Sequence, residues 1–311
     1  MRPKHIEQAI QLTEHAAQQG DASALMQLAV WRLVGQPLER DLPGARMLLR
    51  QAVQIGHVDA ALMEIALTAN GSGGSANWGS ARSLLDVAAQ NDPIAAHQRD
   101  LIEAMNIDAE GRPLALPTAR QLRDAPHVEV IPQFVTRDEC HHLASVSAPS
   151  LVPSVIIDPS TGKSRPHPIR TSDGMVIGPA QEDLVVRAIN ARIAALSKTP
   201  VDNGEPLAVL RYNPGQEYKL HSDALPDASN QRSHTVILYL NEGFPGGETE
   251  FPAIGLRVRP EAGMALLFTN LREDGSPDPL ARHAGLPIAQ GSKWIATRWI
   301  RQRHYDPWNS G

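Results

Sequence analysis

Three side chains in the last third of the sequence have the types and spacing of a metal site. His221 and Asp223 are separated by one residue, and a second histidine, His283, follows in the same region. Two imidazoles and one carboxylate can hold a divalent metal by one face and leave the opposite face open for other ligands. A His-x-Asp pair alone is weak evidence, because most such pairs lie in turns or solvated patches. The surrounding elements must therefore support the assignment.

The residues around the pair predict short β-strands. Segments 207–212 and 217–221 have strand composition, and the Asn-Pro-Gly sequence at 213–215 predicts a turn between them. His221 and Asp223 have the same parity, so on an extended chain both side chains face the same way. The local pattern thus favours convergence of the two candidate ligands.

More short strands are predicted further along, separated by Gly and Pro. They lie at 234–241, 248–251, 256–259, 264–269, around 283 and at 293–301. In all, about eight strands without an intervening helix favour a double-sheet jelly roll over a parallel sheet. In such a barrel, residues far apart in the sequence can meet inside one mouth.

Five blocks of sequence, in this order, carry a family resemblance. Together they resemble the prolyl 4-hydroxylase branch of the iron(II)/2-oxoglutarate dioxygenases, and the resemblance covers residues 125–303. The blocks are RTSDGM (170–175), LAVLRYNPGQEYKLHSD (207–223), QRSHTVILYLNEGFPGGETEFP (231–252), PEAGMALLF (260–268) and HAGLPIAQGSKWIATRWI (283–300).

The resemblance implies roles for particular residues. The iron ligands, which form the catalytic centre, would be His221, Asp223 and His283. The cosubstrate-binding residues would be Lys293, which pairs with the far carboxylate of 2-oxoglutarate, and the hydrogen-bond donors Tyr212 and Thr249. The substrate-binding residues would be Arg232, Tyr218 and Trp299. Arg232 could equally be a loop arginine in water, and Trp299 could equally be a core residue.

The pattern around Lys293 agrees with that role. Lys293, Ile295, Thr297 and Trp299 alternate along one predicted strand, so they share a face. If that face points into the barrel, the buried ammonium needs an anionic partner, because an unpaired buried charge is too costly to desolvate. The alternative is an exposed lysine on an edge strand, which is common.

One segment departs from the family pattern. Family members commonly carry an aromatic pair and a longer loop after the aspartate, whereas this chain has Ala-Leu-Pro-Asp-Ala-Ser-Asn at 224–230. A shorter loop beside the metal predicts a more open or differently shaped substrate entrance. This puts proline as the target in doubt, but not the iron chemistry.

The first third of the chain is repetitive. Segment 45–61 recurs at 81–97, which is 36 residues later, and 16–24 carries the same motif one period earlier. A period of this length with small residues at helix contacts predicts stacked helical hairpins. The pattern resembles the Sel-like repeats, relatives of the tetratricopeptide repeats. We therefore expect a helical-repeat domain over 1–107 and the dioxygenase domain over 117–311, with Gly and Pro between them.

Composition sets limits. With 311 residues the chain suits two domains. One cysteine, Cys140, rules out an intrachain disulfide and suits a reducing compartment. No signal-peptide core or membrane-length apolar run is present, so we expect a cytoplasmic protein without a membrane partner. A net charge of −5 argues against nucleic acid as a partner.

The expected fold is a multidomain α+β chain: an all-α repeat domain followed by a double-stranded β-helix, or jelly roll, with flanking helices. The expected activity is iron(II)- and 2-oxoglutarate-dependent hydroxylation of an unactivated C–H bond with O2, in a prolyl residue of a peptide or protein docked by the repeats. Succinate and CO2 would be released, and ascorbate is a candidate reductant. The alternatives are a hydroxylase of a free amino acid or metabolite, and a non-catalytic adaptor whose repeats bind partners.

Overall fold

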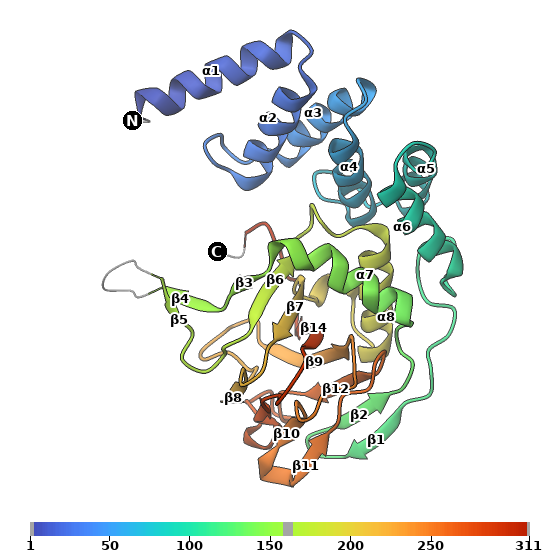
Figure 1. Cartoon of the computed structure of the whole chain (residues 1–311), viewed down its shortest axis with the longest axis vertical. Coiled ribbons are helices and arrows are strands. Elements are labelled where there is room, and N and C mark those ends of the chain that lie inside the picture. Colours follow the sequence, from blue (N-terminus) through green and yellow to red (C-terminus); the bar gives the residue numbers. More distant parts are fainter. Residues whose placement is uncertain (1–2, 158–163, 310–311) are drawn as a thin grey trace. The chain divides into compact units, whose positions relative to one another are not determined.

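The computed structural model describes residues 3–157 and 164–309. The chain divides into two compact units (Figure 1). The first comprises Met1–Leu114 and Pro179–Ala188, and the second comprises Ala115–Gly178 and Ile189–Gly311. No helix in the described part of the chain is long and apolar enough to cross a membrane.

The first unit contains three consecutive helical hairpins. The paired helices are α1 (Lys4–Gln18) with α2 (Ala22–Val34), α3 (Leu42–Gln54) with α4 (Val58–Asn70), and α5 (Trp78–Ala88) with α6 (Pro93–Ala104). Alanines at the helix contacts are fully buried and let the helices approach closely: Ala45, Ala52, Ala60, Ala81 and Ala95. The predicted small-residue contacts therefore occur in the structure.

The helix ends repeat with the 36-residue period of the sequence. Asp41 and Asn77, one period apart, cap α3 and α5 by accepting hydrogen bonds from backbone N–H groups in the first turn. Gly35 and Gly71, also one period apart, end α2 and α4 in the left-handed conformation, with φ of 83° and 80°. Start and stop signals thus recur along with the alanine pattern.

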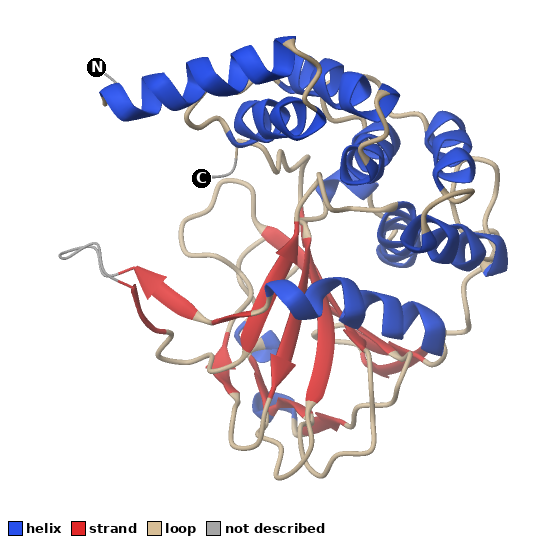
Figure 2. Cartoon of the chain, turned by 45° about the horizontal axis from the view of Figure 1, so that its top comes forward, coloured by secondary structure: helices blue, strands red, loops and turns tan. Residues whose placement is uncertain are grey.

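The second unit is built on two antiparallel sheets (Figures 1 and 2). The large sheet has the order β1-β2-β12-β9-β14-β7-β6-β3, and the small sheet has the order β11-β10-β13-β8. The strands of the large sheet are β1 (Arg120–Arg123), β2 (Val128–Ile131), β3 (Val152–Pro153), β6 (Asp173–Ile177), β7 (Leu207–Tyr212), β9 (Arg232–Tyr239), β12 (Ala265–Thr269) and β14 (Lys293–Arg301). Those of the small sheet are β8 (Tyr218–His221), β10 (Thr249–Phe251), β11 (Leu256–Val258) and β13 (His283–Gly285).

The strands from β7 to β14 form the jelly roll, with four in each sheet. Each predicted strand is present, although β9 begins and ends two residues earlier than predicted. The core between the sheets includes Phe251 and Phe268, whose rings meet edge to face with centroids 5.1 Å apart. Burial of alternating apolar residues thus accounts for this half of the unit.

Elements that were not predicted individually extend the jelly roll. Strands β1, β2, β3 and β6 widen the large sheet, and β4 (Val155–Ile157) pairs with β5 (Ser164–Pro166) in a separate ribbon. Helix α7 (Arg137–Ser147) contacts strand β7 (Figure 2), and helix α8 (Leu184–Ser197) belongs to the second unit from Ile189 onward. The thiol of Cys140, in α7, is buried, and burial raises its pKa to about 11.

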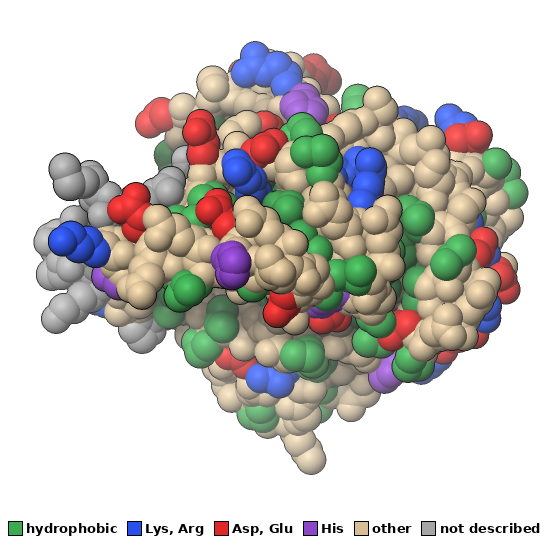
Figure 3. Space-filling model, turned by 90° about the horizontal axis from the view of Figure 1, so that it is seen from above, with side chains coloured by type: hydrophobic (Ala, Val, Ile, Leu, Met, Phe, Trp, Pro, Cys, Tyr) green, Lys and Arg blue, Asp and Glu red, His purple; other side chains and the backbone are tan. Residues whose placement is uncertain are grey.

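The face of the molecule in Figure 3 carries side chains of both charge signs, and they are interspersed with hydrophobic ones. Basic side chains do not gather into one field on that face. Nucleic-acid binding relies on neutralising many phosphates with Lys and Arg. The absence of nucleic acid among the partners stays a prediction from the net charge of −5.

Candidate active site

The small sheet brings the three predicted metal ligands together. His221 ends β8, Asp223 follows two residues later, and His283 begins β13. The two strands are neighbours, and His283 pairs directly with His221. One ligand atom from each residue lies within 4.8 Å of the others, and all three side chains are buried. No second group of this kind occurs among residues 3–157 and 164–309.

Backbone carbonyls orient both imidazoles. Nδ1 of His221 lies 2.8 Å from the carbonyl oxygen of Lys219, and Nδ1 of His283 lies 3.1 Å from that of Ala281. A carbonyl can only accept, so in each ring Nδ1 carries the proton and Nε2 presents its lone pair to the cluster. Metal-binding histidines are typically held in this way.

The protonation states also suit a metal. Burial lowers the pKa of His283 to about 4, so its ring is neutral at pH 7. Burial alone would raise the pKa of Asp223, but attraction to His283 and His221, when these rings are protonated, outweighs it and lowers the pKa below its usual range. Neutral imidazole and ionised carboxylate are the forms that bind metal.

The distances within the cluster indicate what it can hold. Nε2 of His221 is 3.5 Å from Oδ1 of Asp223, and Nε2 of His283 is 3.7 Å from Oδ2. Both distances exceed that of a good charge-assisted hydrogen bond. The three groups face one another but do not form short hydrogen bonds, so their ligand atoms are available to a metal. This donor set of two nitrogens and one oxygen fits iron(II).

Lys293 lies at the beginning of β14 and is buried, with 2% of its surface exposed. Its ammonium donates a 2.7 Å hydrogen bond to the carbonyl oxygen of Gly247 and lies 5.4 Å from the ring centre of Tyr212. Burial lowers the pKa of Lys293 to about 8, although attraction to Glu248 opposes the shift. A single neutral acceptor compensates poorly for a buried ammonium, so the site favours an anion.

The metal cluster and Lys293 line one pocket of about 30 Å³. Its wall also contains Ile295, Thr297 and Trp299, so the predicted alternation on β14 faces inward. The alternative of an exposed edge-strand lysine is therefore wrong. Tyr218 narrows the pocket because its ring stacks on that of His221, with centroids 3.5 Å apart and planes 11° apart.

The two predicted hydrogen-bond donors, Tyr212 and Thr249, also line the pocket. The Tyr212 hydroxyl forms a hydrogen bond with Ser172. The Thr249 hydroxyl lies 2.7 Å from that of Tyr239, a residue that the sequence pattern did not single out. Both hydroxyls therefore have protein partners that hold them beside Lys293.

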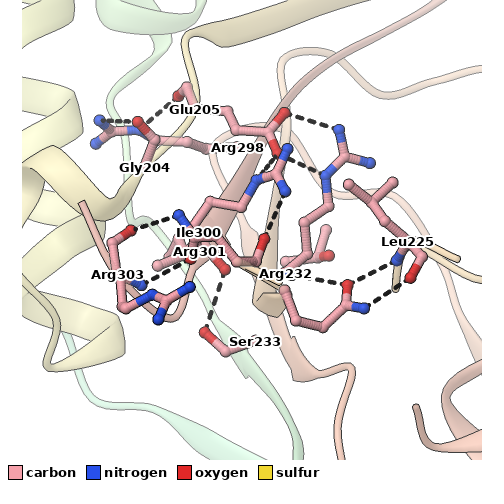
Figure 4. A network of polar contacts seen from close by, with 12 residues as sticks. Gly204, Glu205, Leu225, Arg232, Ser233, Arg298, Ile300, Arg301 and Arg303 are labelled. Atoms are coloured by element: carbon pink, nitrogen blue, oxygen red, sulfur yellow. Dashed lines mark hydrogen bonds and ion pairs between the residues drawn. The ribbon is translucent and has the colours of Figure 1, made fainter. Parts of the chain in front are cut away.

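Arg232 does not line this pocket among the described residues; it is bound to Glu205 (Figure 4). Its Nε and Nη2 donate to the two carboxylate oxygens of Glu205, at 2.6 and 2.7 Å. Arg301 donates to the same carboxylate, at 2.5 Å. The guanidinium of Arg232 also stacks on Trp299, 4.1 Å from the ring centre. Arg232 thus supports the outer side of a pocket-lining residue.

Segment 224–230, where the sequence departs from the family pattern, is closed by Gln231. The Gln231 side chain accepts from the backbone N–H of Leu225, at 2.6 Å, and donates to its carbonyl oxygen, at 2.7 Å (Figure 4). These two bonds tie the ends of the segment together. The loop next to Asp223 therefore has a defined path.

Several polar residues around the site were not predicted. Thr235 and Tyr239 had a signal, because they share parity on strand β9 and therefore face the same side. Glu205 and Asn270 had no such signal. Glu205 precedes strand β7, Asn270 follows strand β12, and neither belongs to a sequence motif. Only the fold shows that Glu205 binds Arg232 and that Asn270 contacts Thr235.

Comparison with known proteins agrees with this geometry. Residues 207–301 match the 2OG-Fe(II) oxygenase superfamily. Prolyl 4-hydroxylase 1 of Arabidopsis thaliana is 36% identical over 198 residues, which covers 58% of this chain and 70% of the relative. Prolyl 4-hydroxylase 5 of the same plant is 38% identical over 204 residues, with the same coverage of 58% and 70%.

Among solved structures, the viral collagen prolyl hydroxylase of Paramecium Bursaria Chlorella virus-1 is similar, with 29% identity and a TM-score of 0.47, over 57% of this chain and 97% of that one. A prolyl-4-hydroxylase of Pseudomonas putida has 23% identity and a TM-score of 0.43, over 57% and 92%. On the strength of the sequence relatives, this chain belongs to the prolyl 4-hydroxylase family of the 2OG-Fe(II) oxygenases and is an iron(II)- and 2-oxoglutarate-dependent dioxygenase.

Proposed function

We propose that the protein hydroxylates a prolyl residue in a peptide or protein. The observation that carries the proposal is one buried pocket that holds both the His221–Asp223–His283 cluster and the ammonium of Lys293. Relatives whose sequences match over 58% of the chain are named prolyl 4-hydroxylases, which supports proline as the target.

The proposed roles follow from the geometry of the pocket. Nε2 of His221, Nε2 of His283 and a carboxylate oxygen of Asp223 would hold iron(II). The ammonium of Lys293 would bind the far carboxylate of 2-oxoglutarate, because it is buried and, among the described residues, has only the Gly247 carbonyl as a hydrogen-bond acceptor. The hydroxyls of Tyr212 and Thr249, which line the same wall, would donate to that carboxylate.

Bound iron(II), 2-oxoglutarate and O2 supply the oxidation, in which one oxygen atom enters succinate as CO2 is lost and the other enters the substrate C–H bond. The chain contributes positioning and exclusion of water. Apolar side chains of Leu210, Ile237 and Ile295 line the pocket and keep it dry around the polar groups. A dry site strengthens the attraction between Lys293 and a carboxylate.

On the substrate side, Trp299 would form the wall of the entrance and Tyr218 would cover His221 until a substrate arrives. Arg232 would contact the substrate through the guanidinium N–H groups that do not donate to Glu205. It would also hold Trp299 in place through the stacked contact. The closed path of segment 224–230 would leave this entrance open on one side.

Turnover with defined substrates tests the proposal. A proline-containing peptide, the same peptide with the proline replaced by alanine, and free proline are each incubated with the iron-loaded protein and 2-oxoglutarate. The proposal predicts stoichiometric succinate release and a gain of one oxygen only with the proline peptide. Turnover of free proline alone would establish a metabolite hydroxylase instead, and release of no succinate under any condition would favour the adaptor.

The proposed function of the first unit is to dock the substrate chain at a distance from the hydroxylated residue. Supporting this, its helix caps recur with the 36-residue period of the sequence, and its helices form a groove of about 1190 Å³. Three exposed apolar side chains line the groove or its rim: Val58, Leu84 and Val87. Stacked helical repeats commonly use such concave surfaces for binding.

Charge indicates which chain would fit. In the groove, Glu64 accepts from both Arg46 and Arg50, at 2.7 and 2.8 Å, so two guanidiniums share one carboxylate. The side chain of Arg50 remains 58% exposed. A substrate segment that combines acidic and apolar residues would complement this surface.

Single charge insertions in the full-length protein test the docking. Leu84→Glu places a carboxylate in the groove, and Leu12→Glu places one on an equally helical, exposed position outside it. The proposal predicts that Leu84→Glu raises KM for a full-length protein substrate but leaves KM for a short proline peptide unchanged, because the peptide never used the groove. Equal behaviour of the two variants would contradict it.

A further inference from the structure

The carboxylate of Asp223 is the end of a chain of buried hydrogen bonds. The hydroxyl of Thr235 donates to Oδ2 of Asp223, at 2.7 Å. The side-chain amide of Asn270 in turn donates to the hydroxyl oxygen of Thr235, at 2.9 Å. Thr235 is fully buried and Asn270 is 1% exposed, so water does not compete for these groups.

These hydrogen bonds can run in only one direction, from Asn270 to Thr235 to Asp223. An ionised carboxylate accepts hydrogen bonds but cannot donate them, so the single hydroxyl proton of Thr235 must point at Asp223. The hydroxyl oxygen then accepts from the NH2 group of Asn270. A flipped amide would present its carbonyl oxygen to Thr235 and compete with Asp223 for that one proton. The amide orientation of Asn270 therefore keeps the Thr235 proton on Asp223.

Among the described residues, Thr235 is the hydrogen-bond partner that the structure gives the side chain of Asn270. Its side-chain oxygen is buried and has no hydrogen-bond partner, so the amide is not held from that end. Its backbone is held instead: the N–H donates to the carbonyl oxygen of Ser233, at 2.8 Å, and the carbonyl accepts from Asp278, at 2.9 Å. A buried polar atom without a partner is costly. The bond to Thr235 is thus the visible reason for the presence of a buried amide here.

Strand register fixes Thr235 itself. It lies in the middle of the large sheet, where it pairs with Phe268 on β12 and with Trp299 on β14. A threonine also has a restricted side-chain torsion, because it is branched at Cβ. The donor to Asp223 is therefore held by the rigid sheet, whereas Asp223 itself lies just beyond the end of β8.

We propose that Thr235 and Asn270 are positioning residues for the metal-binding carboxylate. By keeping Oδ2 of Asp223 in a hydrogen bond, they favour binding of the metal through Oδ1 alone. A carboxylate that used both oxygens would occupy one more coordination position, and fewer would remain for 2-oxoglutarate and O2. This inference rests on the proposed iron ligands. Hydrogen-bonding partners of this kind commonly tune metal sites.

Co(II) titration of the full-length protein, without 2-oxoglutarate, tests the inference independently of turnover. Thr235→Val deletes the hydroxyl but keeps the shape, and it should weaken Co(II) binding by about 10–100-fold. Thr235→Ser restores the hydroxyl and should bind within about twofold of the wild type, a margin well inside that range. Asn270→Leu should cause a smaller loss in the same direction, since it touches Thr235 and not Asp223.

Thr269→Val is the matched control, because Thr269 is a partly buried threonine on the neighbouring strand β12, where its hydroxyl accepts from the backbone N–H of His127, and it does not line the pocket. It should leave Co(II) affinity unchanged. Melting curves of the metal-free variants check the fold, and if Thr235→Val does not fold, the loss in Asn270→Leu together with rescue by Thr235→Ser decides the matter. Wild-type affinity in Thr235→Val, or a loss in Thr235→Ser as large as in Thr235→Val, overturns the inference.

Asp223→Ala separates this inference from the assignment on which it rests. If Asp223→Ala binds Co(II) as tightly as the wild type, the proposed ligand set itself is wrong. If Asp223→Ala loses the metal while Thr235→Val keeps it, the ligand set stands and only the positioning role fails. The two failures therefore give different results in the same titration.

Discussion

Two buried carboxylates in the second unit, Glu205 and Asp223, each have two basic side chains as neighbours, but only Glu205 makes short hydrogen bonds to them. Glu205 accepts from Arg232 and Arg301 at 2.5 to 2.7 Å, so both of its carboxylate oxygens are bound by guanidinium groups. Asp223 lies between two histidines at 3.5 and 3.7 Å, and each histidine is held from behind by a backbone carbonyl. The comparison shows that side chains at a binding site are held in position by other residues while their ligand atoms stay available.

The largest effect should come from removing the charge at the open cluster. Asp223→Asn replaces the carboxylate by a neutral group of the same shape, and metal affinity should fall on the order of a thousandfold, equivalent to about 4.1 kcal/mol. The melting temperature of the metal-free protein should change little, because the amide oxygen still accepts from Thr235. Metal titration and thermal denaturation of one sample check both statements.

Substitution of Glu205, which is bound by Arg232 and Arg301, should lower the stability of the protein but not its metal affinity. Glu205→Ala leaves the partly buried Arg232 and Arg301 without their carboxylate, which should cost about 3 kcal/mol of unfolding free energy, the lower end of the cost of breaking a buried ion pair. Metal affinity of the folded fraction should be unchanged, since Glu205 does not line the metal pocket. Urea denaturation measures the loss, with Glu205→Gln as the milder control. A stable Glu205→Ala protein would break the comparison.

Lys293 resembles the open cluster, because its ammonium is held without a carboxylate. Lys293→Met should weaken 2-oxoglutarate binding by about one to two decades, from loss of a charge-assisted bond of roughly 1.5–3 kcal/mol. Iron affinity should be retained. The metal-free variant should be at least as stable as the wild type at pH 7, since burial disfavours the charged lysine. An unchanged requirement for 2-oxoglutarate would remove Lys293 from the binding site.

The smallest effect is a pH dependence of 2-oxoglutarate binding. The pKa of Lys293 is lowered to about 8 in the free protein, so the ammonium is present below that pH and lost above it. Between pH 7 and pH 9, affinity for the dianion should therefore fall about tenfold. Lys293→Arg stays charged over this range and should show a flat profile, which separates the lysine from pH effects on the metal.

The residues that sequence could place are those with a local pattern. His221 and Asp223 share strand parity, and so do Lys293 and Trp299. The alternation of side chains along a strand therefore predicts that the members of each pair face the same way, and all four line the pocket. The alanine period likewise predicted the paired helices of the first unit. Strand pairing across the jelly roll was needed only to bring His283 next to His221.

The residues that sequence could not place act through long-range contacts. Glu205 meets Arg232 and Arg301 across turns and strands, and Asn270 reaches Thr235 from the neighbouring strand end. These contacts join residues that are 27, 96 and 35 positions apart in the sequence, so local spacing does not predict them. The resemblance assigned Arg232 to the substrate, yet its main partner in the structure is Glu205.

The position of Cys140 has a practical consequence for an enzyme that handles O2. Iron that reacts without a substrate produces stray oxidants, and thiolates are the side chains that such oxidants attack first. The one thiol of this chain is buried, and its pKa of about 11 leaves almost no thiolate at neutral pH. We therefore expect Cys140 to resist oxidation to sulfenic acid and crosslinking into dimers during uncoupled turnover.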